Sequence, residues 1–136
     1  MAETSGKVSW RQAFVLAGAG AVAGVGGSIG LALAAGWLAR GRAEGLQDLA
    51  AAVLGMFAGF VIACPAGVRL AGARMGLAGS GVISFAASVA AGFLGIGVPN
   101  LLPVNAFTQT MIVSVPLFSL VASVAAYTFT HTRRVA

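Results

Sequence analysis

The sequence contains few residues that could carry chemistry. Of its 136 residues, three are Asp or Glu, one is His and one is Cys, and only 8% are charged, where soluble domains average about 25%. A lone cysteine can form neither an internal disulfide nor a metal site. Haem ligation would need a histidine within an apolar stretch, and His131 lies beyond the last one. We therefore predict no cofactor and no metal site.

The apolar content defines the class of protein. Hydrophobic residues make up 59% of the chain and the mean hydropathy is +0.97. A soluble fold of this size would have too few polar residues to cover its outside. In a bilayer that difficulty disappears, because the solvent is itself apolar. The composition predicts a single-domain, all-α integral membrane protein.

The spacing of the charges predicts the number of helices. Arg11 and Arg40 enclose 28 uncharged residues, Asp48 and Arg69 enclose 20, and 56 separate Arg74 from His131. A span needs about 20 apolar residues, so the first two stretches hold one helix each and the third holds two. The Pro- and Asn-rich segment 99–105 supplies the turn between them. We predict four transmembrane helices, at about 13–38, 49–68, 76–98 and 106–130.

The basic residues predict the orientation. Six of the eight lie at one side of these four helices: Lys7, Arg11, Arg69, Arg74, Arg133 and Arg134. Because Lys and Arg favour the cytoplasmic side, we expect both termini to be cytoplasmic (N-in/C-in) and these residues to contact anionic head groups. Trp10, Trp37 and Tyr127 are expected at the membrane interfaces. Paired arginines at helix ends do not form a basic face, which argues against a nucleic-acid partner.

Small residues recur at every fourth position in three of the predicted helices. In a bilayer, such rows let helices approach closely, so we predict helix packing through them. The rows are Gly20, Gly24, Ser28, Ala32 and Gly36; Ala51, Gly55, Gly59, Ala63 and Gly67; and Gly76, Ser80, Ser84, Ser88 and Gly92. The expected partners are the lipid bilayer and either further copies of the chain or other membrane subunits. On this view Gly24→Leu or Ser84→Leu disrupts assembly and leaves insertion intact.

A possible internal repeat relates the two halves. At an offset of 56 residues, the segment 34–38 resembles 90–94, Gly20 falls on Gly76, and Ser28 falls on Ser84. The segment 60–65 resembles 111–116 at a slightly shorter offset. The protein is then a duplicated helical hairpin with both copies in the same orientation, although Ala- and Gly-rich sequence also aligns with itself by chance.

Two prolines within predicted spans raise the possibility of a solute path. Broken helices at matching places in two halves are typical of transporter sites. The candidate path residues are Cys64, Pro65, Gln109, Thr110, Ser114 and Pro116. Cys64-Pro65 resembles the Cys-Pro pair in membrane helices of metal-pumping ATPases, but a proline kink beside a small buried thiol is the more favoured reading. The segment 18–30 resembles the glycine-rich first helix of rotary ATPase ring subunits, whose ion-binding carboxylate has no counterpart in 49–68.

Three functions fit these features. The best supported is a small structural or accessory membrane protein that packs through its Gly, Ala and Ser faces into a larger assembly. The alternative is a channel or transporter subunit built from two hairpins, and a holin-like permeabiliser is a third. An enzyme is the least favoured, because intramembrane catalysis needs ionisable or nucleophilic groups at depth.

The abundance of Ala, Gly and Arg is typical of a GC-rich prokaryotic or viral genome, so we expect a prokaryotic inner membrane or one derived from it.

Overall fold

The computed structural model describes residues 8–39, 46–97 and 107–135, without the side chains of 46–47, 107–109 and 133–135. The described residues form four α-helices: α1 (Trp10–Ala39), α2 (Leu46–Arg74), α3 (Gly81–Gly97) and α4 (Phe107–Val135). The predicted all-helical fold with four helices in this order is confirmed. Three of the helices are long and apolar enough to cross a membrane. At 17 residues, α3 is about 25 Å long, shorter than the ~30 Å of bilayer hydrocarbon.

Side chains and backbone at the helix ends explain where α1 begins and α2 stops. Ser9 and Gln12 form a capping box, in which the backbone N–H of each residue donates to the side chain of the other, so α1 begins before the predicted 13. Gly76 has a φ of 72° and ends α2 in a Schellman motif, with the Leu77 N–H donating to the Gly72 carbonyl at 2.8 Å. The prediction that α2 ends at Val68 is therefore wrong: it continues to Arg74.

The start of α3 also differs from the prediction. The small-residue row places Gly76 and Ser80 within the third helix as packing residues, but both lie in the turn between α2 and α3. Ser80 caps α3 instead, since its hydroxyl accepts the Ile83 N–H at 3.4 Å. Glycine at position 76 is needed for its positive φ, because a Cβ there would be strained. The predicted turn at 99–105 lies outside the described residues.

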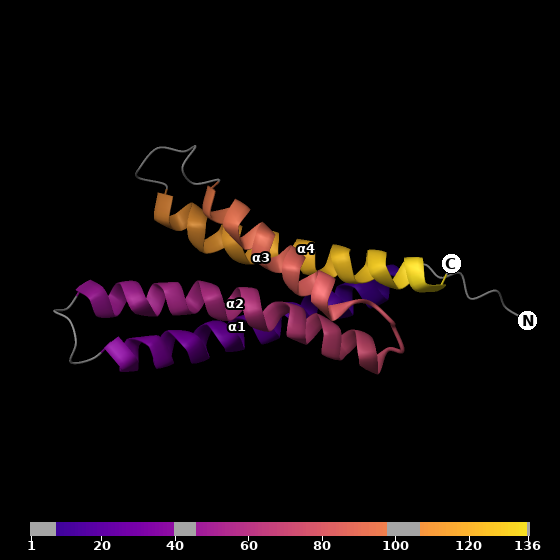
Figure 1. The fold of residues 1–136 in the computed structure, drawn as a ribbon, viewed down its shortest axis with the longest axis horizontal. Helices are drawn as coiled ribbons and strands as arrows, with labels where there is room; N and C mark the ends of the chain where they lie inside the picture. The colour runs from indigo at the N-terminus through magenta and orange to yellow at the C-terminus, as the bar shows by residue number, and fades with distance from the viewer. Residues whose placement is uncertain (1–7, 40–45, 98–106, 136) are drawn as a thin grey trace, which may run out of the picture.

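The helices form two antiparallel hairpins, α1–α2 and α3–α4. Both α2 and α4 contact all three other helices, so these two form the centre of the bundle. Figure 1 shows the hairpins lying together at the end that holds the α2–α3 turn and separating toward the other end. Where they meet, Leu16, Val68, Leu77 and Tyr127 form a buried core.

The positions of the helices limit how far the proposed 56-residue repeat can extend. At an offset of 56 residues, the second half of α1 falls on α3, but its first half falls on the end of α2 and the following turn. Gly20 lies in mid-helix and Gly76 in the turn, so these two positions are not structural counterparts. The offset of 56 residues therefore relates α1 to α3 over at most the second half of α1, because the end of α2 and the α2–α3 turn occupy the positions equivalent to its first half.

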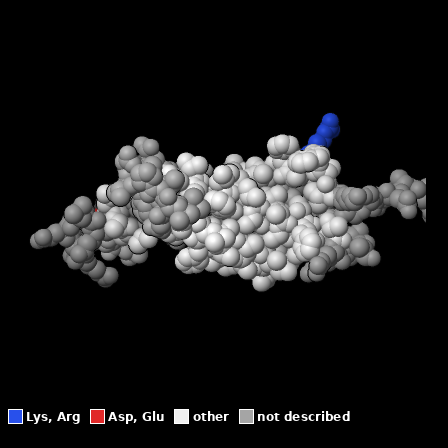
Figure 2. Space-filling view, turned by 90° about the horizontal axis from the view of Figure 1, so that it is seen from above, with Lys and Arg blue, Asp and Glu red and all other residues white. Residues whose placement is uncertain are grey.

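The outer surface of the bundle is apolar. Figure 2 shows one face that is almost free of charged side chains over the helices, with a basic side chain projecting at one end. Arg11 at the start of α1 and Arg74 at the end of α2 lie at the same end of this hairpin, and Asp48 lies near the other. Trp10 and Trp37 are exposed near opposite ends of α1. Tyr127 lies near the end of α4, as expected, but it is only 2% exposed, so its side chain faces the bundle.

Candidate functional site

A very close helix contact joins α1 and α2. A Cβ added to Gly59 would collide with the Gly27 backbone, and one added to Gly55 would lie 2.6 Å from the Leu31 carbonyl oxygen. A Cβ added to Gly67 would likewise lie 2.6 Å from the Ala19 carbonyl oxygen. The small-residue row of α2 therefore lies directly against the backbone of α1.

The backbone contact on α1 coincides with the predicted row only at Ser28. The other backbone positions that α2 touches are Ala19, Gly27 and Leu31, which belong to a row one residue before the predicted Gly20, Gly24, Ser28, Ala32 and Gly36. Gly20 and Gly24 instead make room for the side chains of Val68 and Phe60. Gly36 makes only a loose contact, because a Cβ added to it would lie 3.7 Å from the Cβ of Ala52. Gly27 could have been found in the sequence, because it extends the Ala19–Ala23 spacing by one further step of four.

Along α3, three of the predicted packing residues face the other helices. Ser84 and Ser88 are completely buried, and a Cβ on Gly92 would lie 2.9 Å from a Val61 methyl group. Sequence reasoning missed Gly95, where a Cβ would lie 2.8 Å from the Val115 backbone. Its position three residues after Gly92, on the same helix face, was the available signal.

A serine compensates for the proline of α2. Proline has no N–H, so Pro65 leaves the Val61 carbonyl, four residues earlier, without its helical partner. The Ser88 hydroxyl of α3 donates to that carbonyl at 3.0 Å. A buried carbonyl without a partner would be costly, and α3 supplies one. This bond joins the two hairpins at the proline.

Because of this arrangement, the loss of stability caused by removing the Ser88 hydroxyl should depend on Pro65. We expect Ser88→Ala to lower the free energy of unfolding in detergent by about 1 kcal/mol. In a Pro65→Ala background the backbone N–H restored at position 65 satisfies the Val61 carbonyl, so the same Ser88→Ala substitution should cost close to nothing. Denaturant unfolding of the four variants measures this double-mutant cycle, and equal costs in both backgrounds would contradict the compensation.

Three other buried hydroxyls also donate to backbone carbonyls. Ser114 donates to the Gly95 carbonyl in the last turn of α3 at 2.8 Å, Ser84 donates to the Ser123 carbonyl at 3.0 Å, and Ser119 donates to the Ser88 carbonyl at 3.2 Å. Gly95 precedes Pro99 by four residues, so this carbonyl cannot receive the N–H that would extend the helix. Hydrogen bonds of this kind join α3 to α4 by polar contacts within an apolar bundle.

The turn between α2 and α3 is tied to the end of α4. The Tyr127 hydroxyl donates to the Leu77 carbonyl at 3.0 Å, and the aromatic ring packs against Gly72 and Gly79. Two backbone N–H groups of the turn donate to α4 side chains: Ala78 to Nδ1 of His131 at 3.0 Å and Ser80 to Oγ1 of Thr130 at 2.9 Å. His131 and Thr130 therefore both act as hydrogen-bond acceptors for the turn.

The predicted path residues are not brought together. Cys64 is buried beside Ser123 in the packed interior, Pro65 borders a groove between α2 and α3, and Pro116 borders a separate cleft. Thr110 and Ser114 line a shallow hollow along α4, and the side chain of Gln109 lies outside the described residues. Both helices also continue through their prolines, so the expectation of broken helices at matching places is wrong.

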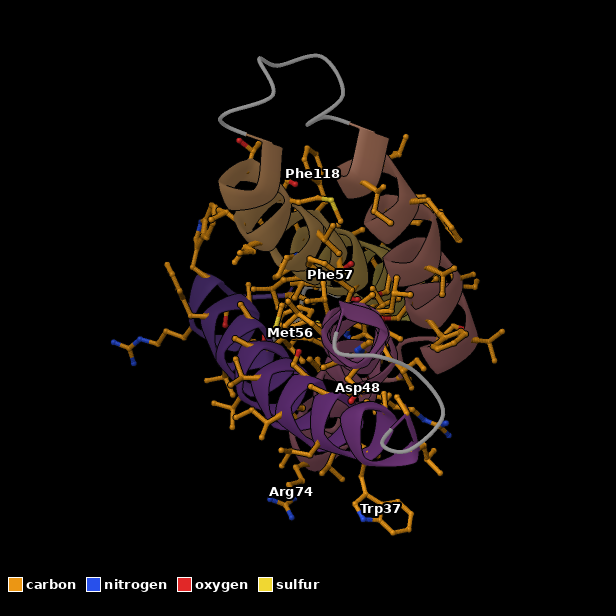
Figure 3. The ribbon with its side chains drawn as sticks, turned by 90° about the vertical axis from the view of Figure 1, so that its left-hand side faces the viewer. Trp37, Asp48, Met56, Phe57, Arg74 and Phe118 are labelled. Atoms are coloured by element: carbon orange, nitrogen blue, oxygen red, sulfur yellow. The ribbon has the colours of Figure 1, made fainter. Side chains whose placement is uncertain are left out.

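The cleft at Pro116 lies where the hairpins separate. It has a volume of about 430 Å³ and is lined from α1, α2 and α4, chiefly by Ile29, Leu33, Phe57, Phe60 and Ile112, with Ser28 and Ala32 also in its lining. Figure 3, viewed from this end, shows Met56 and Phe57 between the two hairpins and Trp37 pointing away from them. The lining is nearly all apolar, which suits an apolar ligand or lipid better than an ion.

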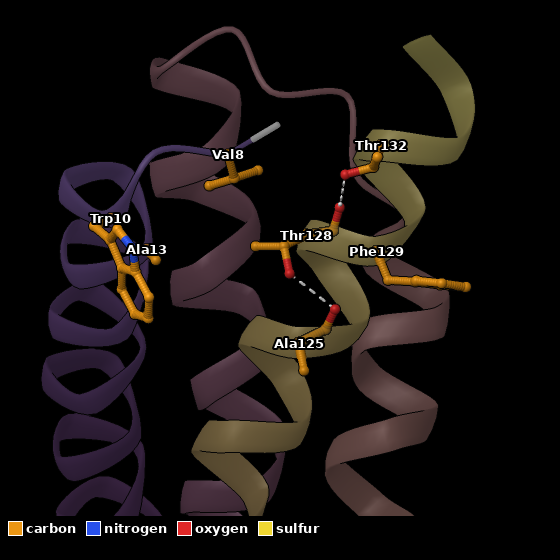
Figure 4. Close-up of a pocket in the computed structure, with 7 residues that line it drawn as sticks. All are labelled: Val8, Trp10, Ala13, Ala125, Thr128, Phe129 and Thr132. Atoms are coloured by element: carbon orange, nitrogen blue, oxygen red, sulfur yellow. Dashed lines mark hydrogen bonds between the residues drawn. The ribbon is translucent and has the colours of Figure 1, made fainter. Parts of the chain in front are cut away.

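A second groove lies between the start of α1 and the end of α4 (Figure 4). Its lining includes Trp10, Ala13, Thr128, Phe129 and Thr132, and its volume is about 570 Å³. The two threonine hydroxyls donate to carbonyls of their own helix, each at 3.0 Å. Hydroxyls engaged in this way are not free to bind a ligand strongly, so the groove presents mainly apolar surface.

One face of α1 carries glycines that contact none of the other helices described by the structure. A Cβ added to Gly18, Gly26 or Gly30 would meet nothing within 4 Å. Gly26, Gly30 and the exposed Ala34 follow each other at intervals of four residues, and exposed Val22, Ile29 and Leu33 lie beside them. This α1 outer face, defined by Gly26, Gly30 and Ala34, is a small-residue row that does not pack against α2, α3 or α4 as far as these helices are described.

The described residues hold no group of three or more His, Cys, Asp or Glu side chains placed to bind a metal ion. No protein-family model matches the sequence, and neither the curated proteins nor the solved structures contain a significant match. The helix faces and grooves are therefore the features from which a function can be inferred.

Proposed function

We propose that the chain is a small structural or accessory membrane protein that associates laterally with another transmembrane helix through the α1 outer face. It would span the bilayer four times, with both termini on the cytoplasmic side. The length and apolar surface of three helices support insertion. The position of Arg11 and Arg74 at one end supports the orientation. The partner helix would belong to a second copy or to another subunit of a larger assembly.

The observation that carries the proposal is the contrast between the two sides of α1. Gly27 is in backbone contact with α2, whereas Gly26 and Gly30 touch nothing. Glycine in a helix is less favourable than alanine by about 1 kcal/mol, so these two residues weaken α1 without a compensating contact to any described residue of the chain. A row of small residues on a lipid-exposed face lets a second helix approach closely, which is how membrane helices associate.

Leucine substitutions on this face test the proposal. We expect Gly30→Leu, and more strongly Gly26→Leu with Gly30→Leu, to convert the complex seen by native mass spectrometry after mild extraction into the single chain. Insertion should be unchanged and thermal stability should not fall, because a Cβ at either position meets no described atom within 4 Å and leucine favours the helix more than glycine does. The matched control is Gly97→Leu at the exposed end of α3, which should leave the complex intact. A wild-type protein that is extracted only as single chains, or a complex that survives both leucines, would refute lateral association through α1.

The second candidate is a transport role, and the cleft between α1, α2 and α4 is the observation in its favour. A path at this place would run past Phe57 and Phe60, not past Cys64 and Pro65. The apolar lining would suit a hydrophobic solute. The accessory role has the stronger support, because the α1 outer face has no other evident use.

A further inference from the structure

An arginine borders the apolar groove between α2 and α3. The groove has a volume of about 540 Å³, and its lining runs along α2 from Ile62 to Ala73 and along α3 from Gly81 to Phe85. The α2 part of this lining is about 16 Å long at the rise of an α-helix, close to the depth of one leaflet of a ~30 Å hydrocarbon core. Arg69 lies toward the basic end of this groove, and apolar residues line the rest: Ile62, Pro65, Ala66, Leu70, Val82 and Phe85.

The charge of Arg69 has no counterpart in the described part of the chain. Asp48 is the only acidic residue there, and it lies 21 residues earlier on the same helix, which is about 30 Å away. A guanidinium at the edge of the hydrocarbon region is costly without an anion or water beside it. The guanidinium fork is also well suited to binding a phosphate through two parallel hydrogen bonds.

Gly81 makes room for the stem of this arginine. A Cβ on Gly81, the first residue of α3, would lie 2.6 Å from Cδ and 3.2 Å from Nε of Arg69. The stem of the arginine side chain therefore crosses directly over the start of α3, while the residue remains exposed at the surface. A larger residue at position 81 would displace the side chain from the groove while keeping its charge.

We propose that this groove is a binding site for one anionic phospholipid, with the phosphate at Arg69 and an acyl chain along the apolar α2–α3 surface. The shape and charge complement such a lipid: a cation at the interfacial end and an apolar channel one leaflet deep. The site is distinct from the α1 outer face, because only residues of α2 and α3 line it. The inference rests on the proposed insertion of the chain in a membrane but not on lateral association.

Native mass spectrometry of the full chain in detergent, titrated with phosphatidylglycerol or phosphatidylcholine, tests the site. We expect wild type to retain phosphatidylglycerol in preference to phosphatidylcholine, and Arg69→Gln to reduce its affinity for phosphatidylglycerol about five- to tenfold. Gly81→Val should cause a similar loss although the charge remains. Arg74→Gln is the matched control, because Arg74 is a basic residue of the same helix that does not line the groove. Its affinity should stay within about twofold of wild type if the site is local.

The outcomes separate the competing explanations. Equal affinity of Arg69→Gln and wild type, or equal losses in Arg69→Gln and Arg74→Gln, would overturn a specific site in favour of general attraction to basic residues. If inorganic phosphate displaced bound phosphatidylglycerol as effectively as more of the lipid does, the site would bind phosphate without an acyl chain. That result would also overturn the proposal. Extraction with alkaline carbonate checks insertion separately. A chain released by carbonate would refute both proposals, whereas an inserted chain without lipid preference would refute only this one.

Discussion

Gly59→Leu is expected to separate α1 from α2 and to abolish the native bundle. A Cβ at position 59 would already collide with the Gly27 carbonyl and the Ser28 backbone nitrogen. Backbone atoms cannot rotate aside as a flexible side chain can, so the helices must move apart along their whole contact. The cost should reach or exceed the upper end of the ~1–3 kcal/mol typical of overpacking. Thermal unfolding in detergent, followed by circular dichroism, measures it.

Gly18→Leu is the matched control for this experiment. It makes the same substitution in α1, at a position where nothing lies within 4 Å, and its unfolding temperature should stay close to that of wild type. Both variants should still insert, because leucine is more apolar than glycine. Similar stability of Gly59→Leu and Gly18→Leu would show that the close contact between Gly27 and Gly59 does not exist in the protein.

Tyr127→Ala is expected to release the α2–α3 turn from α4. The side chain is buried among Leu16, Val68 and Leu77, and its hydroxyl donates to the Leu77 carbonyl. Truncation of a buried aromatic residue costs about 3–5 kcal/mol. Limited proteolysis at the turn, together with denaturant unfolding in detergent, should show both the local opening and the loss of stability.

Tyr127→Phe separates packing from hydrogen bonding at this position. It keeps the ring between Gly72 and Gly79 and removes only the donor to Leu77, so we expect a loss of about 1–2 kcal/mol. If Tyr127 were exposed to head groups, as its sequence position suggests, both variants would have nearly wild-type stability. That outcome would contradict the buried position.

The sequence suggests Gly24→Leu and Ser84→Leu as tests of assembly, but the contacts of these residues show that both would also affect the fold of the single chain. Gly24 lies against the Phe60 ring, and Ser84 is fully buried with its hydroxyl bonded to the Ser123 carbonyl. Both substitutions would therefore disturb the single chain before any partner is involved. The residues suited to an assembly test are Gly26 and Gly30.

The sequence was sufficient to predict four helices in their order, because a charge is so costly in an apolar environment that Arg11, Arg40, Asp48 and Arg69 limit where the first two apolar helices can lie. The Pro- and Asn-rich segment 99–105 then divides the third apolar stretch in two. It was less accurate at helix ends. Arg69 belongs to α2 because a long side chain can extend its charge toward water from within a helix, and Gly76 ends that helix because its φ is positive.

Which face of each helix is used was decided only by the tertiary structure. In an Ala- and Gly-rich helix such as α1, rows one residue apart are almost equally small, so the sequence could not distinguish the row containing Gly27 from the row containing Gly24. The geometry of α2 against α1 made that choice. The same holds for Ser88 and Tyr127, whose acceptors are the carbonyls of Val61 and Leu77. Backbone acceptors of this kind leave no trace in the residue types, and only the packing of distant helices brings donor and acceptor together.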